Sequence, residues 1–575
     1  PLMTWDQHER EYLESVLQLE SVACKDYLTN KVDRSVTGKV AKQQCAGELQ
    51  LPLNNLGVVA FDYQGGKGIA NSIGHAPMAG LVSPSNGSIL AIAESLTNIV
   101  WAPIEGGVKG ISLSANWMWP CKNPGEDARL YEAVKAASDF ALALELNIPT
   151  GKDSLSLSQK YKDGEMVISP GTVIISAAGE AENVWNVVEP VLKAIPNSSL
   201  IYIDLSRSAL ELGGSSFAQI VNKLGDKTPT VADPLYFAAV FERIQRMIRD
   251  EMIFAGHDVS AGGLVTTLLE MNFANTEGGL HINLDGFGEA DWIKILFSEN
   301  PALVVQIPDS AKELLISSNI NFIELGTVSD KRQVSLTLGG KQLDLDIDVL
   351  RDYWYRTSYL LDTKQSGERL AKERYNNYKS QALTFTFPEG FTGNYSQYDI
   401  DRYRRSPSGV KAGIIREKGV NGDREMAYAM YLAGFDVKDI HMTDLISGRE
   451  TLDELNFIVF PGGFSNSDVL GSARGWAGAF LYNAKAKEAL DRFYQRDDTL
   501  SLGVCNGCQL MVELNLISPE LGEPPQLLRN ESGKFESAFL GVDVTESNSI
   551  MLRSLAGASL GIWVAHGEGR FQFAD

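Results

Sequence analysis

Residues 499–513 read Thr-Leu-Ser-Leu-Gly-Val-Cys-Asn-Gly-Cys-Gln-Leu-Met-Val-Glu and contain the most informative pattern in the chain. The apolar run at 500–504 is typical of a short buried strand, and from Gln509 the apolar residues recur at helical spacing. Between the two, residues 503–507 have the Gly-x-nucleophile-x-Gly spacing of a strand-to-helix elbow. A Cβ on either flank of the nucleophile would crowd such a tight turn. The stretch therefore predicts a strand, a sharp turn and a helix.

The elbow makes Cys505 a candidate nucleophile. It places the thiol near the N-terminus of the following helix, where unpaired N–H groups and the helix dipole favour a thiolate and stabilise an oxyanion. Gly462 and Gly463 follow another apolar run and can present backbone N–H groups to an oxyanion opposite Cys505. We therefore expect Gly462 and Gly463 to form the oxyanion site.

Two other interpretations of Cys505 and Cys508 stay open at this point. The pair could be a redox couple or half of a zinc site, or Cys505 could be a buried structural thiol. A zinc site needs a second Cys or His pair, and the remaining cysteines are isolated and far upstream. A thioredoxin-type pair lacks the glycine on each side of its first cysteine. We favour the nucleophile and expect Cys508 to pack on the helix.

Composition and charge limit the class of protein. The chain has 575 residues, with 44% apolar and 22% charged residues, so we expect three or four globular domains. A formal charge of -22 argues against binding a nucleic acid over a broad surface, but magnesium held by acidic side chains can still bring a nucleotide. No apolar run is long enough to span a bilayer, no leader opens the chain, and five cysteines fit a reducing compartment. We expect a cytoplasmic protein that binds neither membrane nor nucleic acid.

The pattern of strands and helices divides the chain. After residue 410, apolar strands alternate with helices and carry loops at their carboxyl ends, which is typical of a parallel α/β sheet with its site at that edge. The chain begins Pro-Leu-Met and ends within an apparent strand, so we interpret it as an internal piece of a longer chain. The expected domains are a helical lead-in (1–30), two subdomains (31–190 and 195–345), a connector (346–409) and the parallel α/β domain (410–575).

Two upstream stretches are candidate sites for a cation or a nucleotide. Glu94 and Asn98 lie four residues apart on one face of a predicted helix and could ligate one hard cation; a solvated helix face is the alternative. Asp258 and Ser260 lie on a glycine-rich loop before a predicted helix, as a metal carboxylate and a phosphate-contacting hydroxyl, or simply as an N-cap region. We expect His257, beside them, to be packed or hydrogen-bonded.

Two other polar stretches are predicted as turns. Residues 65–68, Gly-Gly-Lys-Gly, lack the spacing and the Ser/Thr of a phosphate loop, so a hairpin turn is the better interpretation. Residues 33–38, Asp-Arg-Ser-Val-Thr-Gly, close a turn after the helical lead-in. Neither stretch is assigned a function from its own residues.

Several motifs together carry a resemblance to a known family. The chain resembles phosphoribosylformylglycinamidine synthase in its large single-chain form. The resembling stretches in the C-terminal part are 462–465, 468–471, 503–509 and 566–570, and those upstream are 33–38, 94–98, 114–118, 151–156 and 256–263.

The resemblance implies a fold and an activity. The fold is α/β and α+β multidomain: an aminoimidazole-ribonucleotide-synthetase-like module of two subdomains, followed by a flavodoxin-like class I glutamine amidotransferase domain truncated at its C-terminus. The implied reaction, in de novo purine biosynthesis, converts formylglycinamide ribonucleotide, glutamine and ATP to formylglycinamidine ribonucleotide, glutamate, ADP and phosphate. This chain would be the second synthetase repeat plus most of the glutaminase, with the first repeat expected in cis. The rival hypotheses are a non-catalytic nucleotide-binding scaffold of a purine-synthesis assembly and a redox protein using Cys505 and Cys508.

The resemblance also implies residue roles. Cys505 matches the glutaminase nucleophile. Glu94, Asn98 and Asp258 match Mg²⁺ ligands at an ATP or ADP site, and Asn55 stands where the family has a fourth ligand, an aspartate.

Two further positions match residues around that nucleotide. Asn54 and Ser260 are the implied nucleotide contacts. Ala261 stands where the family has an acidic residue, so fewer charges face the metal here than in the family.

The partners of the nucleophile are a separate question. His566 and Glu568 have the spacing of a base and its orienting carboxylate, and His566 is the only histidine after Cys505. The resemblance instead makes this segment a separate motif and puts the catalytic His and Glu in a later Pro-His-Pro-Glu segment. We therefore expect those partners beyond residue 575, and a cysteine without a base is a poor glutaminase.

Overall fold

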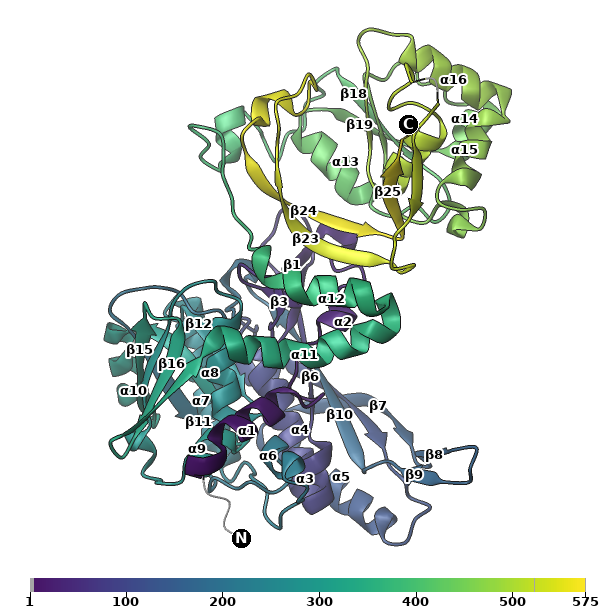
Figure 1. Cartoon of the computed structure of the whole chain (residues 1–575). Helices are drawn as coiled ribbons and strands as arrows, with labels where there is room; N and C mark the ends of the chain where they lie inside the picture. Colours follow the sequence, from purple (N-terminus) through teal and green to yellow (C-terminus); the bar gives the residue numbers. More distant parts are fainter. Residues whose placement is uncertain (1–4, 522, 574–575) are drawn as a thin grey trace. The chain divides into compact units, whose positions relative to one another are not determined.

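In the computed structural model, which describes residues 5–521 and 523–573, the chain forms two units (Figure 1). The first unit comprises residues up to 29 together with 40–364 and 368–383. The second comprises residues 30–39, 365–367 and 384 onward. None of the helices in these described residues is both long and apolar enough to cross a membrane.

The first unit contains a six-stranded sheet that is mostly antiparallel. Its strands, in spatial order, are β1 (Val40–Lys42), β4 (Gly57–Ala60), β5 (Gly68–His75), β10 (Thr172–Ala181), β6 (Ile111–Met118) and β7 (Asn147–Ser154). Residues of β5 are alternately buried and exposed because one face of the strand packs against helix α4 (Pro84–Ile99). β4 and β5 pair antiparallel across residues 61–67, which confirms the predicted turn.

A seven-stranded sheet completes the core of this unit. Its strands, in spatial order, are β12 (Ala255–Val259), β14 (Ala302–Pro308), β11 (Ser198–Asp204), β15 (Ile323–Ser329), β13 (Gly279–Asn283), β16 (Gln333–Leu338) and β17 (Lys341–Asp346). All five residues of β12 are buried, and helix α8 (Gly263–Phe273) follows it directly. α4 also packs against β12, so the two upstream candidate stretches lie on neighbouring elements.

The segment predicted as a connector begins with two helices that belong to the first unit, except for residues 365–366 at the end of the first helix. They are α11 (Ile347–Ser366) and α12 (Glu368–Asn377). Trp354 and Tyr355 are buried in the core, and Tyr355 stacks on Tyr378 with ring centroids 4.0 Å apart. Aromatic burial of this kind contributes a large apolar area, which explains why the segment folds onto the unit.

The second unit is built on a four-stranded parallel sheet, as the alternating pattern predicted. Its strands, in spatial order, are β19 (Asp436–His441), β18 (Lys411–Arg416), β20 (Phe457–Phe460) and β21 (Leu500–Gly503). Its helices are α13 (Asp423–Leu432), α14 (Met442–Ser447), α15 (Arg474–Leu481), α16 (Ala484–Tyr494) and α17 (Asn506–Glu513). All four residues of β20 are buried, as expected for an inner strand covered on both faces. β21, which the apolar run predicted as a buried strand, is instead half-buried, because it lies at one end of the described sheet and pairs with β20.

The helix after the elbow begins earlier than the apolar spacing predicted. α17 starts at Asn506 rather than at Gln509, with Cys505 as its N-cap residue. Asn506 and Gly507 are not apolar, so periodicity alone could not include them.

Two pairs of antiparallel strands close the second unit. The longer pair, drawn in yellow in Figure 1, joins β23 (Glu536–Asp543) to β24 (Ser559–His566). The shorter pair joins β22 (Gln526–Arg529) to β25 (Glu568–Gln572). β24 and β25 flank Gly567 and bring this turn to the elbow, where the carbonyl of Ala565 accepts from the Cys505 thiol at 3.4 Å and that of Glu568 from Gln509 Nε2 at 2.6 Å.

Candidate functional sites

The elbow around Cys505 has the strained geometry that its sequence predicted. Cys505 lies at φ 51° and ψ −110°, a left-handed conformation that a non-glycine residue rarely adopts. A Cβ at Gly507 would lie 1.8 Å from the carbonyl oxygen of Phe460, and one at Gly503 would lie 2.6 Å from the Met511 sulphur. Glycine is therefore required on both sides of the nucleophile.

The sulphur of Cys505 is faced by backbone donors from two segments. The N–H groups of Asn506 and Gly463 form hydrogen bonds toward it that lower the pKa of the thiol. Gly462 makes the close approach possible, because a Cβ there would lie 3.1 Å from the Cys505 Cβ. The expected oxyanion pair, Gly462 and Gly463, stays a prediction, and the geometry adds the N–H of Asn506 as a donor that the glycine motif did not indicate.

Other effects on the same thiol act in the opposite direction. Partial burial is the largest effect and raises the pKa of Cys505, and the carboxylates of Asp33 and Asp468 raise it further. The net shift is upward from the ordinary value. The free thiol is therefore protonated and weakly reactive at neutral pH.

This raised pKa predicts the pH dependence of alkylation. The rate of Cys505 modification by iodoacetamide should still be rising at about pH 9, where an ordinary thiol with a pKa near 8.5 is mostly ionised. Only the thiolate reacts, so the rate follows its population. Peptide mass spectrometry across a pH series, with free cysteine as the reference, measures it. If the alkylation rate of Cys505 reaches its plateau at a lower pH than the rate of free cysteine, the raised pKa of Cys505 is contradicted.

The side chain of Asn506 ties the elbow to the loop that follows β20. Its Oδ1 accepts from the N–H of Ser465 at 3.2 Å, and its Nδ2 donates to Asp468 Oδ1 at 3.3 Å and to Gln509 Oε1 at 2.9 Å. Residues 466–468 all have positive φ, so this loop is strained. Asn506 is thus a positioning residue that holds the Gly463 segment against the nucleophile.

His566 and Glu568 have other partners in the structure. His566 Nδ1 lies 3.0 Å from Asn530 Oδ1, and burial lowers the pKa of His566, which keeps its ring neutral. Glu568 Oε2 accepts from the N–H of Ser472 at 3.3 Å. Within residues 5–521 and 523–573, no hydrogen bond joins the His566 ring to Cys505. Catalytic partners beyond residue 575 therefore stay our prediction.

In the first unit, Glu94 and Asn98 both bond helix α4 to strand β5. Glu94 Oε2 accepts from the N–H of His75 at 2.6 Å, and Asn98 Nδ2 donates to the carbonyl of Ile73 at 2.9 Å. These bonds do not involve Glu94 Oε1 or Asn98 Oδ1. Glu94 and Asn98 thus have a structural role, but Glu94 Oε1 and Asn98 Oδ1 take no part in these bonds.

Asp258 carries the strongest indication of a cation. It is 2% exposed, its Oδ1 lies 3.1 Å from His257 Nδ1, and its buried Oδ2 has no hydrogen-bond partner among the described residues. A buried carboxylate oxygen without a partner is costly, and a hard cation would satisfy it. Asn55 Nδ2 also lies 3.2 Å from His257 Nδ1, which brings the two predicted ligands Asn55 and Asp258 to one imidazole.

His257 is hydrogen-bonded, as predicted. Its Nε2 lies 2.9 Å from Glu270 Oε2, opposite the Asp258 contact. Burial lowers the pKa of His257, but the hydrogen bonds to Asp258 and Glu270 outweigh burial and raise the pKa to about 9. The charged imidazole compensates part of the negative charge of Asp258.

The two predicted nucleotide contacts lie on loops. Asn54 Nδ2 donates to the carbonyls of Gln43 at 2.6 Å and Cys45 at 3.1 Å, while its buried Oδ1 has no partner in the described part of the chain. Ser260 lies between β12 and α8, where its carbonyl accepts from the N–H of Gly263 at 3.0 Å. Both remain predictions.

Glu299 was not predicted from the sequence. Its carboxylate accepts from the N–H groups of Ser216 at 2.9 Å and Gly262 at 2.8 Å. Burial raises the pKa of Glu299, and the charge of Glu94 adds to that effect, so the two carboxylates lie within electrostatic range. Glu299 stands alone in its segment, without a spacing pattern that could have identified it.

The metal assignment itself stays a prediction. Among the described residues, no three side chains of His, Cys, Asp or Glu are grouped to hold a metal ion. The candidate set here contains two carboxylates, Glu94 and Asp258, and two amides, Asn55 and Asn98, which lie outside that class of residues.

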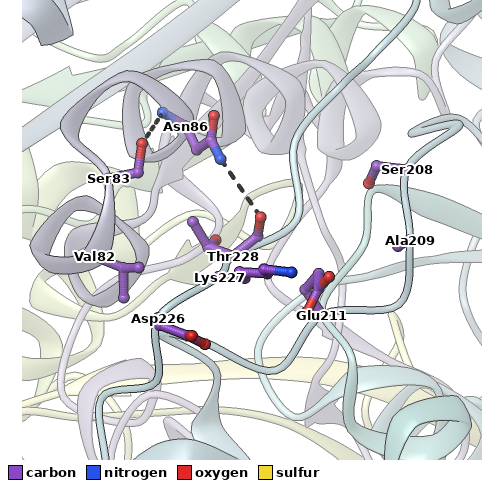
Figure 2. Close-up of a pocket in the computed structure, with 9 residues that line it drawn as sticks. All are labelled: Val82, Ser83, Asn86, Ser208, Ala209, Glu211, Asp226, Lys227 and Thr228. Atoms are coloured by element: carbon purple, nitrogen blue, oxygen red, sulfur yellow. Dashed lines mark hydrogen bonds between the residues drawn. The ribbon is translucent and has the colours of Figure 1, made fainter.

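A cavity of about 300 Å³ lies elsewhere in the first unit (Figure 2). It lies where the N-terminal end of α4 meets residues 208–228, and Asn86 bonds to the carbonyl of Thr228 across it at 3.4 Å. Its lining residues are Val82, Ser83, Asn86, Ser208, Ala209, Glu211, Asp226, Lys227 and Thr228. None of the candidate site residues lines it.

Comparison with family models defines the class of protein. Residues 409–575 match the CobB/CobQ-like glutamine amidotransferase domain, residues 24–180 the FGAR-AT PurM_N-like domain, and residues 196–339 the AIR synthase related protein, C-terminal domain. The matched parts thus resemble a synthetase-like module followed by a glutamine amidotransferase domain, and the predicted fold class is confirmed.

Comparison with curated proteins confirms the resemblance to the phosphoribosylformylglycinamidine synthase family. The chain is 39% identical to the probable phosphoribosylformylglycinamidine synthase, chloroplastic/mitochondrial, of Arabidopsis thaliana, over 98% of this chain and 40% of that protein. It is 39% identical to the phosphoribosylformylglycinamidine synthase of Homo sapiens, over 98% of this chain and 43% of that protein. The chain thus spans about two fifths of the length of these relatives.

Among solved structures, T. maritima PurL complexed with FGAR is 14% identical, with a TM-score of 0.45, over 59% of this chain and 53% of that chain. That likeness is too distant to support an argument about the sites.

Proposed function

We propose that this chain is part of an enzyme that converts formylglycinamide ribonucleotide, glutamine and ATP to formylglycinamidine ribonucleotide, glutamate, ADP and phosphate. In this proposal Cys505 releases the ammonia, and the first synthetase repeat is present in cis. The observation that carries it is the strained thiol of Cys505, faced by the N–H groups of Gly463 and Asn506, in a domain that matches glutamine amidotransferases.

The proposed chemistry is nucleophilic acyl transfer. The Cys505 thiolate attacks the amide carbon of glutamine and forms a C–S bond, while the N–H groups stabilise the charge that develops on the amide oxygen. The C–N bond then breaks, and the protonated amide nitrogen leaves as ammonia. Water hydrolyses the thioester to glutamate and regenerates the thiol. The proton transfers need the His and Glu that we expect beyond residue 575.

Isotope transfer tests the proposed function. Full-length protein is incubated with formylglycinamide ribonucleotide, Mg²⁺·ATP and glutamine labelled at its amide nitrogen. The label is expected in the amidine nitrogen of the product, and the Cys505→Ala variant is expected to transfer none. Unlabelled product would contradict the release of ammonia by Cys505, and a tightly bound nucleotide without turnover would favour the scaffold hypothesis.

We propose that the first unit holds ATP or ADP through Mg²⁺, with Asn55, Glu94, Asn98 and Asp258 as ligands and with Asn54 and Ser260 contacting the nucleotide. The orphaned, buried oxygens of Asp258 and Asn54 support this assignment. A bound Mg²⁺ would neutralise phosphate charge and hold the nucleotide in place.

The Asp258→Asn variant tests the nucleotide site. We expect it to weaken ADP binding about 10-fold in the presence of Mg²⁺, because one charged ligand is lost, and to have little effect with EDTA. Isothermal titration in both conditions measures this. The matched control is Asp163→Asn, an exposed turn residue that accepts from Glu165 N at 3.1 Å. An equal loss with and without Mg²⁺ would show a structural role for Asp258 and contradict the ligand assignment.

We also propose a cytoplasmic location. All five cysteines of the chain are free thiols in the structure, which fits a reducing compartment. The name of the Arabidopsis thaliana relative assigns that protein to organelles.

A further inference from the structure

Residues 30–39 lie in the second unit although they directly precede the first strand of the synthetase-like sheet, β1. The carbonyl of Asn30 accepts from the N–H of Ser537 on β23 at 2.8 Å, and Lys31 Nζ lies 2.7 Å from both carboxylate oxygens of Glu536. The guanidinium of Arg34, a residue only 7% exposed, lies 5.2 Å from the centre of the Trp563 ring on β24. A backbone bond, an ion pair and a cation–π contact therefore fix this segment on the β23–β24 hairpin.

The register of the hairpin connects the segment to the nucleophile. Ser537 pairs with Ala565, and Glu536 pairs with His566. The carbonyl of Ala565 accepts from the thiol of Cys505 at 3.4 Å. The segment is thus anchored at the two hairpin pairs nearest to the sulphur.

Asp33 lies between the two anchored residues Lys31 and Arg34. It is exposed, and its Oδ1 accepts from the N–H of Ser35 at 3.0 Å and from the Ser35 hydroxyl at 3.2 Å, which fixes the turn. Both bonds use Oδ1 and neither uses Oδ2. The Asp33 carboxylate is fixed through Oδ1, and its Oδ2 takes no part in the turn, so the group is suited to bind a cation.

The charge of Asp33 is unfavourable for the free nucleophile. Its carboxylate acts on the thiol and disfavours the thiolate, as does that of Asp468. Asp468 is already bonded to Asn506 Nδ2 at 3.3 Å and to the N–H of Ala473 at 3.5 Å. A carboxylate beside a nucleophile is compensated once the substrate brings a positive charge, and glutamine carries an α-ammonium group.

We propose that residues 30–39 form a wall of the glutamine site and that Asp33 binds the α-ammonium group of glutamine. The inference rests on the proposed glutaminase function and deepens it by naming a residue for substrate recognition. Binding would also cancel the charge that opposes the thiolate, so the nucleophile is activated when glutamine occupies the site. The sequence motif at 33–38 thereby gains a role that its own residues did not indicate.

A comparison of two ligands tests the role of Asp33. Full-length protein is alkylated at Cys505 by iodoacetamide in the presence of either L-glutamine or glutaramate, which is glutamine without its α-amino group. We expect glutamine to protect wild-type Cys505 at a concentration about 10-fold lower than glutaramate, and Asp33→Asn to abolish this preference. Because the preference is a ratio within one variant, it is independent of the basal alkylation rate and of the folded fraction.

Matched variants separate charge from structure. Asp401→Asn changes another exposed turn aspartate of the same unit, which accepts from Tyr403 N at 2.8 Å, and should keep the preference. Asp33→Glu keeps the negative charge and should keep most of the preference for glutamine over glutaramate. An Asp33→Asn variant that still prefers glutamine, or an Asp33→Glu variant that loses the preference as Asn does, would overturn the inference. If glutamine fails to protect wild-type Cys505, the proposed function itself is contradicted.

Discussion

Replacing Cys505 by alanine is expected to reduce glutamine hydrolysis about 10⁴-fold or more, because no other group in the elbow can form the thioester. The same variant should still make the amidine product from added ammonia, since the sulphur takes no part in the ATP-dependent step. Release of glutamate from glutamine, and product formation with glutamine or ammonia, measure the two effects separately.

Cys508→Ala is the matched control for that experiment. Cys508 lies on α17 three residues after the nucleophile and is partly exposed, so its loss should leave hydrolysis near the wild-type rate. Equal loss of activity in the Cys505 and Cys508 variants would favour the redox pair. Glutamine hydrolysis that survives Cys505→Ala would exclude Cys505 as the nucleophile.

Gly507→Ala should damage the same site through the backbone. The new Cβ would lie 1.8 Å from the carbonyl oxygen and 2.4 Å from the carbonyl carbon of Phe460, which belongs to the buried strand β20. Neither atom can move without moving the strand, so we expect a loss of about 3 kcal/mol in the free energy of unfolding and nearly complete loss of hydrolysis. Urea unfolding and glutamate release measure the two quantities.

The control is Gly541→Ala on β23, where an added Cβ meets no atom within 4 Å. This variant should unfold and hydrolyse glutamine as the wild type does. If the two alanine variants behave alike, the tight contact between the elbow and β20 is wrong.

The strand, turn and helix around Cys505 could be predicted, because residues close together in the sequence determine them. The Gly-x-Cys-x-Gly spacing requires a turn that excludes Cβ atoms, and the apolar runs before it favour strands of a parallel sheet. The apolar run did not show that β21 lies at one end of the described sheet, where it is half-buried. The start of α17 at Asn506 was missed, because a helix that begins with a polar residue and a glycine shows no apolar period there.

The long-range part could not be predicted. That Asn506 holds the strained loop at 466–468, and that the charge of Asp33 acts on the Cys505 thiol, depends on the fold bringing together segments up to about 470 residues apart in the sequence. Glu299 is a single carboxylate whose role arises only from the N–H groups that the fold brings to it. The spacing of residues along the sequence does not predict such contacts.

The upstream candidates illustrate a further limit of sequence reasoning. The helical spacing of Glu94 and Asn98 placed both on one face of α4, but it did not show that each also bonds to strand β5. Similarly, Asp258 was a candidate from its loop, whereas its pairing with His257 and its orphaned oxygen depend on burial. Burial is a property of the whole fold.

Trapping of the acyl-enzyme tests the central claim most directly. Full-length protein is mixed with glutamine, quenched in acid during turnover and digested, and the peptide that contains Cys505 is examined by mass spectrometry. The account predicts that this peptide gains the mass of one glutamyl group, attached as a thioester at Cys505 and removed by hydroxylamine. Glutamine hydrolysis without this adduct, or a disulfide between Cys505 and Cys508 in its place, would contradict it.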